Sequence, residues 1–289
     1  MLVNNQNMYF PVLGIHEFRS GQTAGRKELL YNELHGERHI SRPHKHDFFI
    51  IILFDQGKGV HTIDFQEYPI SNREIHLLFP DQVHTWQMEP ATTGYQLMID
   101  QPYFDRFSTF LRFSSSNYIN HPIIPLSDKS FELLHYEFTA IKHELEATSS
   151  LSEVISARAA VIAAIVSKAA ELVFTDAKVF QSNPRLAKFT TLIDREFKQQ
   201  KQVSYYADIL NISPNYLNIL CKKSLNVSAT QLIQQRILLE AKRLLQATDL
   251  SIKEIAFELG FVDHAYFSNF FKNQTRLTPT GFREQQQFT

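Results

Sequence analysis

The sequence predicts a multidomain protein, in which an N-terminal β-barrel with accompanying helices precedes an all-α domain with two helix-turn-helix motifs. Three observations support this fold class. Short β-rich runs separated by turn residues occupy the first part of the chain, two long helical stripes follow, and one helical pattern occurs twice near the C-terminus. The length of 289 residues suits two domains that each bury a core.

The β-rich runs come first along the chain. Turn segments QGKG, YPISN and PATTG separate them. The runs are HDFFIIILF (46–54), GVHTIDF (59–65), EIHLLF (74–79) and YQLMID (95–100). Several short strands at this spacing are typical of a small barrel or sandwich.

Two amphipathic helices are expected next, over residues 131–145 and 151–173, because large apolar side chains recur there at helical spacing. They can pack on the barrel or on each other. The polar segment TDAKVFQSNPR, residues 175–185, is expected to connect this part of the chain to the C-terminal helices.

A repeat in the C-terminal part predicts the two helix-turn-helix motifs. Residues 207–222 align with residues 256–272, with one additional residue in the second copy. Asn211 and Gly260 then coincide at the turn, and these two residue types tolerate a left-handed backbone best. In each copy a Ser or Asp follows as the N-cap of a second helix. Each copy is therefore expected to form a helix, a tight turn and a capped helix.

The outer face of each second helix is the candidate contact surface for DNA, because a helix-turn-helix places this face in the major groove. Amides and hydroxyls can read base edges, and lysines suit phosphates. The alternative is an amphipathic helix whose polar face only meets water, which two copies in register disfavour. The candidate residues are Asn215, Asn218, Ile219 and Lys222 in the first copy, and His264, Ala265, Ser268, Asn269 and Lys272 in the second. The opposite, core-facing side of the second copy is expected to contain Tyr266, Phe267, Phe270 and Phe271.

Spacing and charge agree with DNA binding. Residues 228–248 predict a helix that joins the copies, and at about 1.5 Å per residue it spans roughly 30 Å, close to the rise of one DNA turn. The whole chain has a net charge of −1, but residues 183–289 contain 14 Lys and Arg against 9 Asp and Glu. Residues 1–182 contain 15 against 21. Positive charge is thus concentrated in the part that carries the repeat.

The C-terminal part, from Ser213 to Arg283, resembles the AraC/XylS family of bacterial transcription regulators. The similarity lies in IAFELGF, YFSNFFK and the closing TP-x-x-FR. Asn226 and Arg276 stand where family members usually carry Gly after each recognition helix. The resemblance implies a regulator that binds promoter or operator DNA, and it implies that helices preceding the DNA-binding part often form a dimer interface.

A second resemblance covers residues 25–105, where RPHKHD and FPDQVHTW are similar to the two half-motifs of the cupin barrel. Such barrels often act as sensor domains beside this type of DNA-binding module. His44, His46 and His84 occupy the histidine positions of metal-binding cupins, but isoleucines at 50–52 replace the carboxylate. We therefore expect no metal and no other cofactor. His44, His46, His84 and Trp86 are assigned instead to an effector pocket, with a purely structural role as the alternative.

The predicted domains are a cupin-like effector-sensing barrel (1–128), a helical dimerisation or packing segment (129–176), a linker (177–184) and an AraC-type double helix-turn-helix domain (185–289). The predicted function is sequence-specific transcription regulation in response to a small-molecule effector, without catalytic residues. Double-stranded DNA, the effector, RNA polymerase and a second copy of the chain are the expected partners. Two alternatives remain open: a metal-dependent cupin enzyme tethered to a DNA-binding domain, and a regulator controlled by a protein partner.

A cytoplasmic location is expected, with no membrane association. Cys221 is the single cysteine, which agrees with a reducing compartment. The sequence shows neither a basic leader followed by an apolar run nor a segment approaching the roughly 20 apolar residues of a membrane span.

Overall fold

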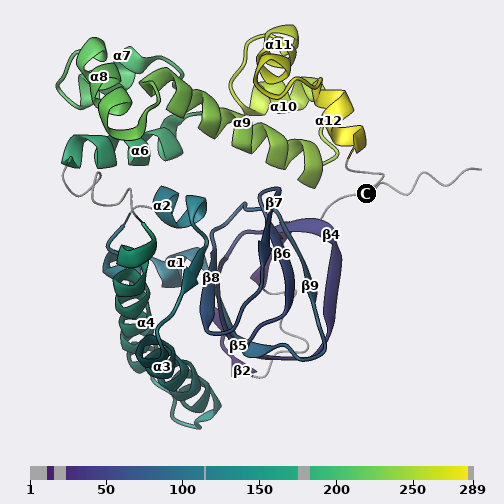
Figure 1. Cartoon of the computed structure of the whole chain (residues 1–289), viewed down its shortest axis with the longest axis vertical. Coiled ribbons are helices and arrows are strands. Elements are labelled where there is room, and N and C mark those ends of the chain that lie inside the picture. Colours follow the sequence, from purple (N-terminus) through teal and green to yellow (C-terminus); the bar gives the residue numbers. More distant parts are fainter. Residues whose placement is uncertain (1–11, 16–23, 114, 175–182, 286–289) are drawn as a thin grey trace, which may run out of the picture. The chain divides into compact units, whose positions relative to one another are not determined.

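The computed structural model describes residues 12–15, 24–113, 115–174 and 183–285. These residues form two compact units, with residues 12–174 in one and residues 183–285 in the other. The first is β-rich with helices, and the second is helical (Figure 1). The predicted linker, residues 177–184, lies mostly outside the described residues, and Pro184 already begins a helix.

The strands of the β-rich unit belong to two sheets. Among the described residues, the five-stranded sheet has the order β1-β4-β9-β6-β7 and the six-stranded sheet has the order β11-β8-β5-β10-β3-β2. Apart from the short β1–β4 pair, all pairings are antiparallel. The strands are β1 (Val12–Leu13), β2 (Ala24–Gly25), β3 (Leu29–His35), β4 (Arg38–His46), β5 (Phe49–Gln56), β6 (Gly59–Ile63), β7 (Gln66–Pro69), β8 (Glu74–Leu78), β9 (His84–Met88), β10 (Thr93–Ile99) and β11 (Ile123–Pro125).

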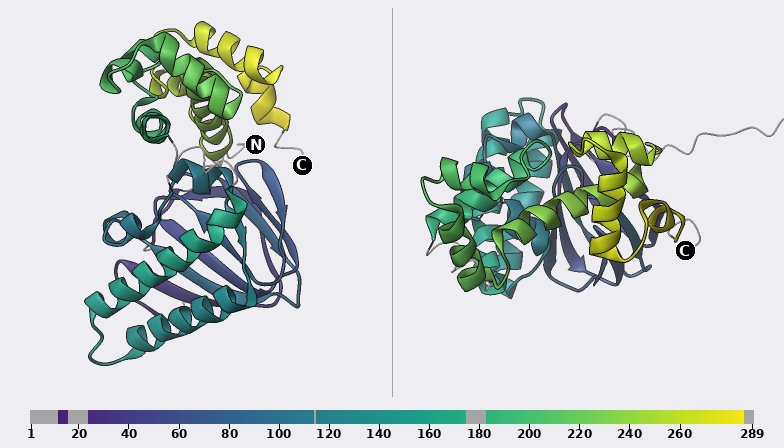
Figure 2. Two further views of the ribbon diagram at one scale, coloured as in Figure 1. Left: turned by 60° about the vertical axis from the view of Figure 1, so that its left-hand side comes forward. Right: turned by 90° about the horizontal axis from the view of Figure 1, so that it is seen from above.

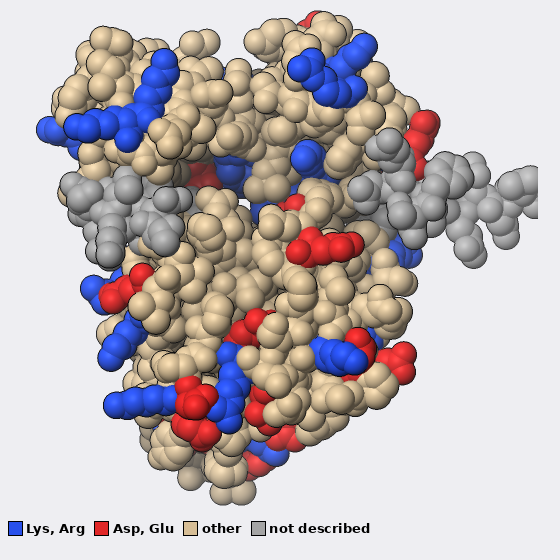
Figure 3. All heavy atoms as spheres, viewed as in Figure 1, with Lys and Arg blue, Asp and Glu red and all other residues tan. Residues whose placement is uncertain are grey.

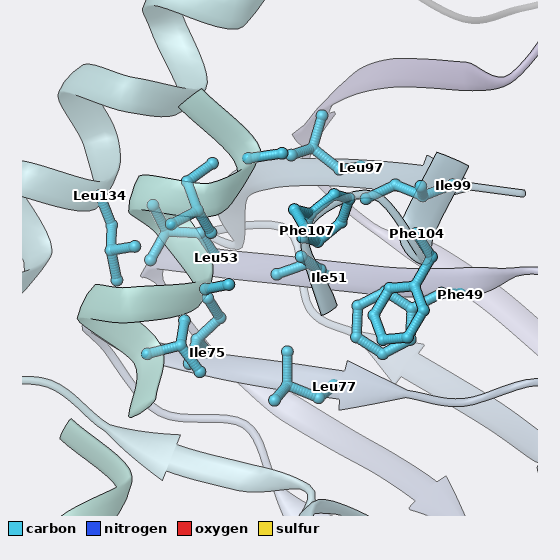
Figure 4. Packing of buried hydrophobic residues seen from close by; sticks show 14 of the residues in the cluster. Phe49, Ile51, Leu53, Ile75, Leu77, Leu97, Ile99, Phe104, Phe107 and Leu134 are labelled. Atoms are coloured by element: carbon cyan, nitrogen blue, oxygen red, sulfur yellow. The ribbon is translucent and has the colours of Figure 1, made fainter. Parts of the chain in front are cut away.

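Strand β5 is buried on both sides, which explains why its sequence is apolar without alternation. Phe49, Ile51 and Leu53 belong to a core that continues into the helices (Figure 4). Ile50 and Ile52 belong to a second core, which lies between the two sheets. The strand predicted over residues 46–54 is thus divided by the structure, because β4 ends at His46 and β5 begins at Phe49.

Helices cover the outer side of the six-stranded sheet. The two long ones are α3 (Asp128–Glu146) and α4 (Ser152–Val173), and they pack on each other and on the sheet (Figure 2). Both predicted apolar stripes are therefore confirmed as helices, and packing on the sheet and on each other occurs together. Shorter elements precede them: α1 (Gln101–Phe104), η2 (Ser108–Phe110) and α2 (Ser115–Asn120).

The helical unit confirms the duplicated motif. Helices α7 and α8 form one helix-turn-helix, α10 and α11 form the other, and α9 lies between them in the chain (Figure 1). The helices are α6 (Pro184–Glu196), α7 (Val203–Ile209), α8 (Pro214–Leu225), α9 (Ala229–Ala247), α10 (Ile252–Glu258), α11 (His264–Thr275) and α12 (Pro279–Gln285).

The turns and caps form as their residue types predict. Asn211 and Gly260 have positive φ angles of 53° and 70°. A Cβ atom at Gly260 would lie 1.9 Å from the carbonyl oxygen of Lys198, so this turn requires glycine for space as well as for conformation. The side chain of Ser213 caps α8, and that of Asp263 caps α11.

Helix α9 contacts both motifs. It packs against α8 of the first motif, against α10 and α11 of the second, and against α12. Ser228 and Gln231 form a capping box at its start. Its 19 residues correspond to about 28 Å at 1.5 Å per residue. The two motifs thus share one continuous helix.

Candidate nucleic-acid interface and barrel cavity

The second helices of the two motifs, α8 and α11, bury one side and expose the other. Leu217 and Cys221 of α8 are fully buried, as are Phe267 and Phe271 at the equivalent positions of α11. Seven of the nine candidate contact residues are exposed: Asn215, Ile219, Lys222, His264, Ala265, Asn269 and Lys272. The structure therefore places them where a groove could receive them.

Asn218 and Ser268 are the two half-buried members of the set, and they occupy equivalent positions. Asn218 Nδ2 donates to the Pro214 carbonyl at 3.3 Å, and its Oδ1 accepts the backbone N–H of Ala229 at 3.0 Å. Ser268 Oγ donates to the His264 carbonyl at 2.9 Å. These bonds hold the amide of Asn218 against the backbone, and its role as a base reader stays a prediction.

Tyr266 was expected on the core-facing side of α11, and the structure corrects this. Its side chain is 67% exposed, and Tyr216 at the equivalent position of α8 is 45% exposed. Each tyrosine is the third residue of its helix, one position before the buried Leu217 or Phe267, so its direction falls outside the apolar stripe. Sequence reasoning placed Tyr266 with the large apolar side chains on one side of the helical period, and it assigned Tyr216 to neither face.

Charge is distributed unevenly over the surface. On the face shown in Figure 3, the helical unit presents Lys and Arg side chains with little acidic surface, whereas the β-rich unit shows both signs in mixed clusters. This pattern agrees with the charge division of the sequence. A cationic surface attracts phosphates at a distance, before short-range contacts form.

The β-rich unit contains a cavity of about 90 Å³ between its sheets. His44 and His46 reach it from β4, and His84 and Trp86 reach it from β9. The structure thus brings together the four residues assigned to a pocket. The rest of the lining comprises Asn32, Arg38, Ile40, Phe48, Ile50, Gln96 and Met98.

The histidines of the cavity are deeply buried, and burial sets their charge. Desolvation lowers the pKa of His44 and holds the pKa of His84 well below its usual range. Both imidazoles are therefore neutral at pH 7. The Nδ1 of His44 lies 3.3 Å from the Arg42 carbonyl, and a proton on that nitrogen leaves a lone pair on Nε2.

Sequence reasoning missed three polar residues behind His84. His61 of β6 and His76 of β8 are fully buried, and Glu74 is 5% exposed. His61 Nε2 lies 3.0 Å from His84 Nδ1, which connects the group to the cavity. The sequence contained a signal for them. His61 and His76 are polar residues within apolar strands, at positions where the alternation of the strand directs the side chain into the interior.

Comparison with known families covers both units. Residues 206–285 match the family described as a helix-turn-helix domain, and residues 27–155 match the family described as an AraC-like ligand binding domain. The chain belongs to the AraC family of transcription regulators. Its AraC-type DNA-binding part and its AraC-type ligand-binding part correspond to the two units of the fold.

Three relatives illustrate how far this AraC-type chain resembles known regulators. YijO of Escherichia coli strain K12, an HTH-type transcriptional regulator, is 34% identical over 93 residues, which are 32% of this chain and 33% of YijO. YfiF of Bacillus subtilis strain 168, another HTH-type regulator, is 25% identical over 248 residues, 83% of this chain and 78% of YfiF. The Msm operon regulatory protein of Streptococcus mutans is 25% identical over 250 residues, 83% of this chain and 85% of that protein.

The described helices of this AraC-type chain include none that is both long enough and apolar enough to cross a membrane.

Proposed function

We propose that this AraC-type protein binds an operator through α8 and α11, and that a small molecule in the barrel cavity controls this binding. The observation that carries the proposal is the duplicated, capped helix-turn-helix with an exposed polar stripe on each second helix. A second copy of the same surface doubles the number of base pairs read and favours successive major grooves on one DNA face.

The cavity supports the sensor part of the proposal. It is lined by residues of both sheets and combines apolar side chains with a few polar ones, as small-molecule sites usually do. Trp86 is buried, and its indole N–H has no hydrogen-bond partner among the described residues. A ligand acts on DNA binding only if it favours one state of the protein over another.

A regulatory rather than a catalytic role also belongs to the proposal. It is supported by the relatives, which are named as regulators.

We further propose a cytoplasmic protein that contacts RNA polymerase at its promoter and acts as a homodimer. Exposed apolar side chains on the helices that cover the barrel support the dimer, namely Leu133, Tyr136, Val161 and Leu172. Light scattering with a Leu172→Asp variant tests the dimer, since an unchanged mass contradicts an interface that includes this residue.

Operator binding is tested by selecting DNA sites with the full chain and measuring affinity by gel shift. Lys222→Ala and Lys272→Ala should each weaken binding. Lys129→Ala is the matched control, because it removes the same charge from the exposed surface of α3 in the other unit. Equal effects at all three positions contradict the assigned DNA face.

Effector control is tested on the full chain by a thermal-shift screen of small molecules, followed by gel shifts with each compound that raises the melting temperature. A ligand that binds the folded state raises this temperature. A compound that binds the barrel and changes operator affinity supports the sensor. If no compound binds and a pull-down from cells recovers a partner protein with the full chain, control by a protein is favoured instead.

A further inference from the structure

Two exposed tyrosines occupy the same place in the recognition helices α8 and α11, and the contact set predicted from the sequence includes neither. Tyr216 is the third residue of α8, and Tyr266 is the third residue of α11. Their side chains are 45% and 67% exposed. In the part of the chain that the structure describes, neither hydroxyl has a hydrogen-bond partner. Each hydroxyl is therefore open to a partner outside the chain.

The helical period places each tyrosine at one edge of the exposed face. In α8, Tyr216 directly precedes the buried Leu217, and Asn218 directly follows it. Successive residues of a helix point about 100° apart, so Tyr216 and Asn218 lie on opposite sides of Leu217. Tyr266 has the equivalent position in α11. The exposed face of each recognition helix thus has two edges, and a tyrosine stands on one of them.

The tyrosine edge is the one beside the turn of the motif. The ring centroid of Tyr266 lies 5.8 Å from that of Phe261, a residue of the turn between α10 and α11. The opposite edge of α8 faces α9, because Asn218 accepts the first N–H of that helix. In a helix-turn-helix the first helix crosses the DNA backbone while the second enters the major groove. A side chain at the edge beside the turn therefore lies where the backbone passes the mouth of the groove.

The chemistry of tyrosine suits a phosphate oxygen at this place. The phenolic O–H is a neutral donor, and tyrosine is among the side chains that bond the phosphates of DNA. The third residue belongs to the first turn of the helix, and the N-terminal residues of a recognition helix are those that contact DNA. The ring carries the hydroxyl on a rigid stem, so little conformational freedom is lost when the contact forms.

We propose that Tyr216 and Tyr266 each donate a hydrogen bond to a backbone phosphate of the operator, one beside each of two successive major grooves. These contacts set the depth and rotation of the recognition helices and read no bases. The inference rests on the proposed operator binding and adds to it the residues that position the helices. Because the two tyrosines are equivalent in the repeat, the two phosphates should lie about one DNA turn apart, roughly 10 base pairs.

A neutral donor on a phosphate has a combination of effects that neither a base reader nor a lysine gives. Tyr216→Phe and Tyr266→Phe remove only the hydroxyl, and each should weaken operator binding about 3- to 10-fold. The loss should be the same for operators with changed bases, because a phosphate carries no sequence information. The slope of affinity against salt should stay unchanged, because charged contacts set the number of counterions released.

The test is a gel shift with the full chain on the operator that the wild type selects, over a range of salt concentrations. Tyr68→Phe is the matched control, because it deletes the same hydroxyl from a half-buried tyrosine of β7 in the other unit. An affinity equal to that of the control overturns the contact for that tyrosine. A changed base preference overturns its assignment to a phosphate. Circular dichroism confirms that each variant is folded.

Operators in which single phosphates are replaced by methylphosphonates locate the two contacts. A methylphosphonate replaces one charged oxygen by a methyl group, so the wild type should lose affinity at each phosphate that it contacts. With Tyr266→Phe, one of these substitutions should lose part of its effect, and with Tyr216→Phe another should, about one turn away. If no phosphate shows such an interaction with either variant, the direct contacts are overturned.

Site selection by the wild type separates this inference from the proposed function. If the wild type selects no DNA site, the proposed function fails and the tyrosine contacts fail with it. If the wild type binds its site and both phenylalanine variants bind as tightly as Tyr68→Phe, operator binding stands and only the tyrosine contacts are wrong.

Discussion

Asn218 lies on the stripe that faces away from the core of α8, yet its side chain holds two parts of the backbone together. It accepts the N–H of Ala229, the first residue of α9, which has no partner within its own helix. A residue at this position can therefore stabilise the fold, read DNA, or exchange one role for the other when DNA binds.

Asn218→Ala should lower the free energy of unfolding of the helical unit by about 1–2 kcal/mol, because the N–H of Ala229 loses its acceptor. Urea unfolding followed by circular dichroism measures this. Asn215→Ala, on the exposed face of the same helix, is the control and should change stability little. Unchanged stability together with an altered DNA site would instead make Asn218 a base reader.

Asn269 is exposed one turn into α11, and Lys272 follows nearly one turn later. Asn269→Ala should cost roughly 1–3 kcal/mol on the native operator and relax the preference at one base position, because an amide can bond a base edge. Lys272→Ala should weaken all sequences alike and reduce the salt slope by about one. Site selection with each variant measures both effects, and an unchanged site and affinity for a folded Asn269→Ala would remove it from the base readers.

At the scale of elements, the two recognition helices end in the same way. Asn226 and Arg276 are their C-caps, both left-handed, with φ angles of 58° and 69°. The Cβ of any residue except Gly disfavours this backbone, but Asn tolerates it better than Arg because its short polar side chain can hydrogen-bond locally. The second cap is therefore the more strained of the two.

Arg276→Gly should raise the free energy of unfolding by up to about 1 kcal/mol, and Asn226→Gly should raise it by less. Thermal melting of both variants gives the comparison. If Arg276 also contacts a phosphate, its replacement should reduce the salt slope of operator binding by about one. A melting temperature that falls at Arg276 but not at Asn226 contradicts the strain.

The elements also show what the sequence could predict. The repeat predicted both helix-turn-helix motifs because turn and cap positions require particular residue types, as Asn211 and Gly260 show. The pocket was only partly predictable. His44, His46 and His84 lie in two short sequence motifs and could be found from them. His61 is brought next to them by the pairing of β6 with β9, and no local sequence pattern specifies that pairing.

At the scale of the whole molecule, the two units are separately compact, and each has its own core. We expect residues 180–289 alone to bind the operator, with an affinity that falls steeply as salt rises, because phosphate contacts release counterions. Gel shifts over a range of salt concentrations test this. A folded fragment that shows no specific binding would mean that the β-rich unit takes part in recognition.

Strand β5 separates the cavity of the β-rich unit from the helices that pack on the sheet. One side, with Ile50, lines the cavity, and the other side, with Ile51, supports the helices. A close-packed interior has few voids that could absorb a displacement. An occupant that pushes the strand outwards by a fraction of a side chain should therefore also shift the surface on which α3 and α4 pack. We therefore expect an occupant of the cavity to change the position of the helices across the thickness of a single strand, without any opening of the barrel.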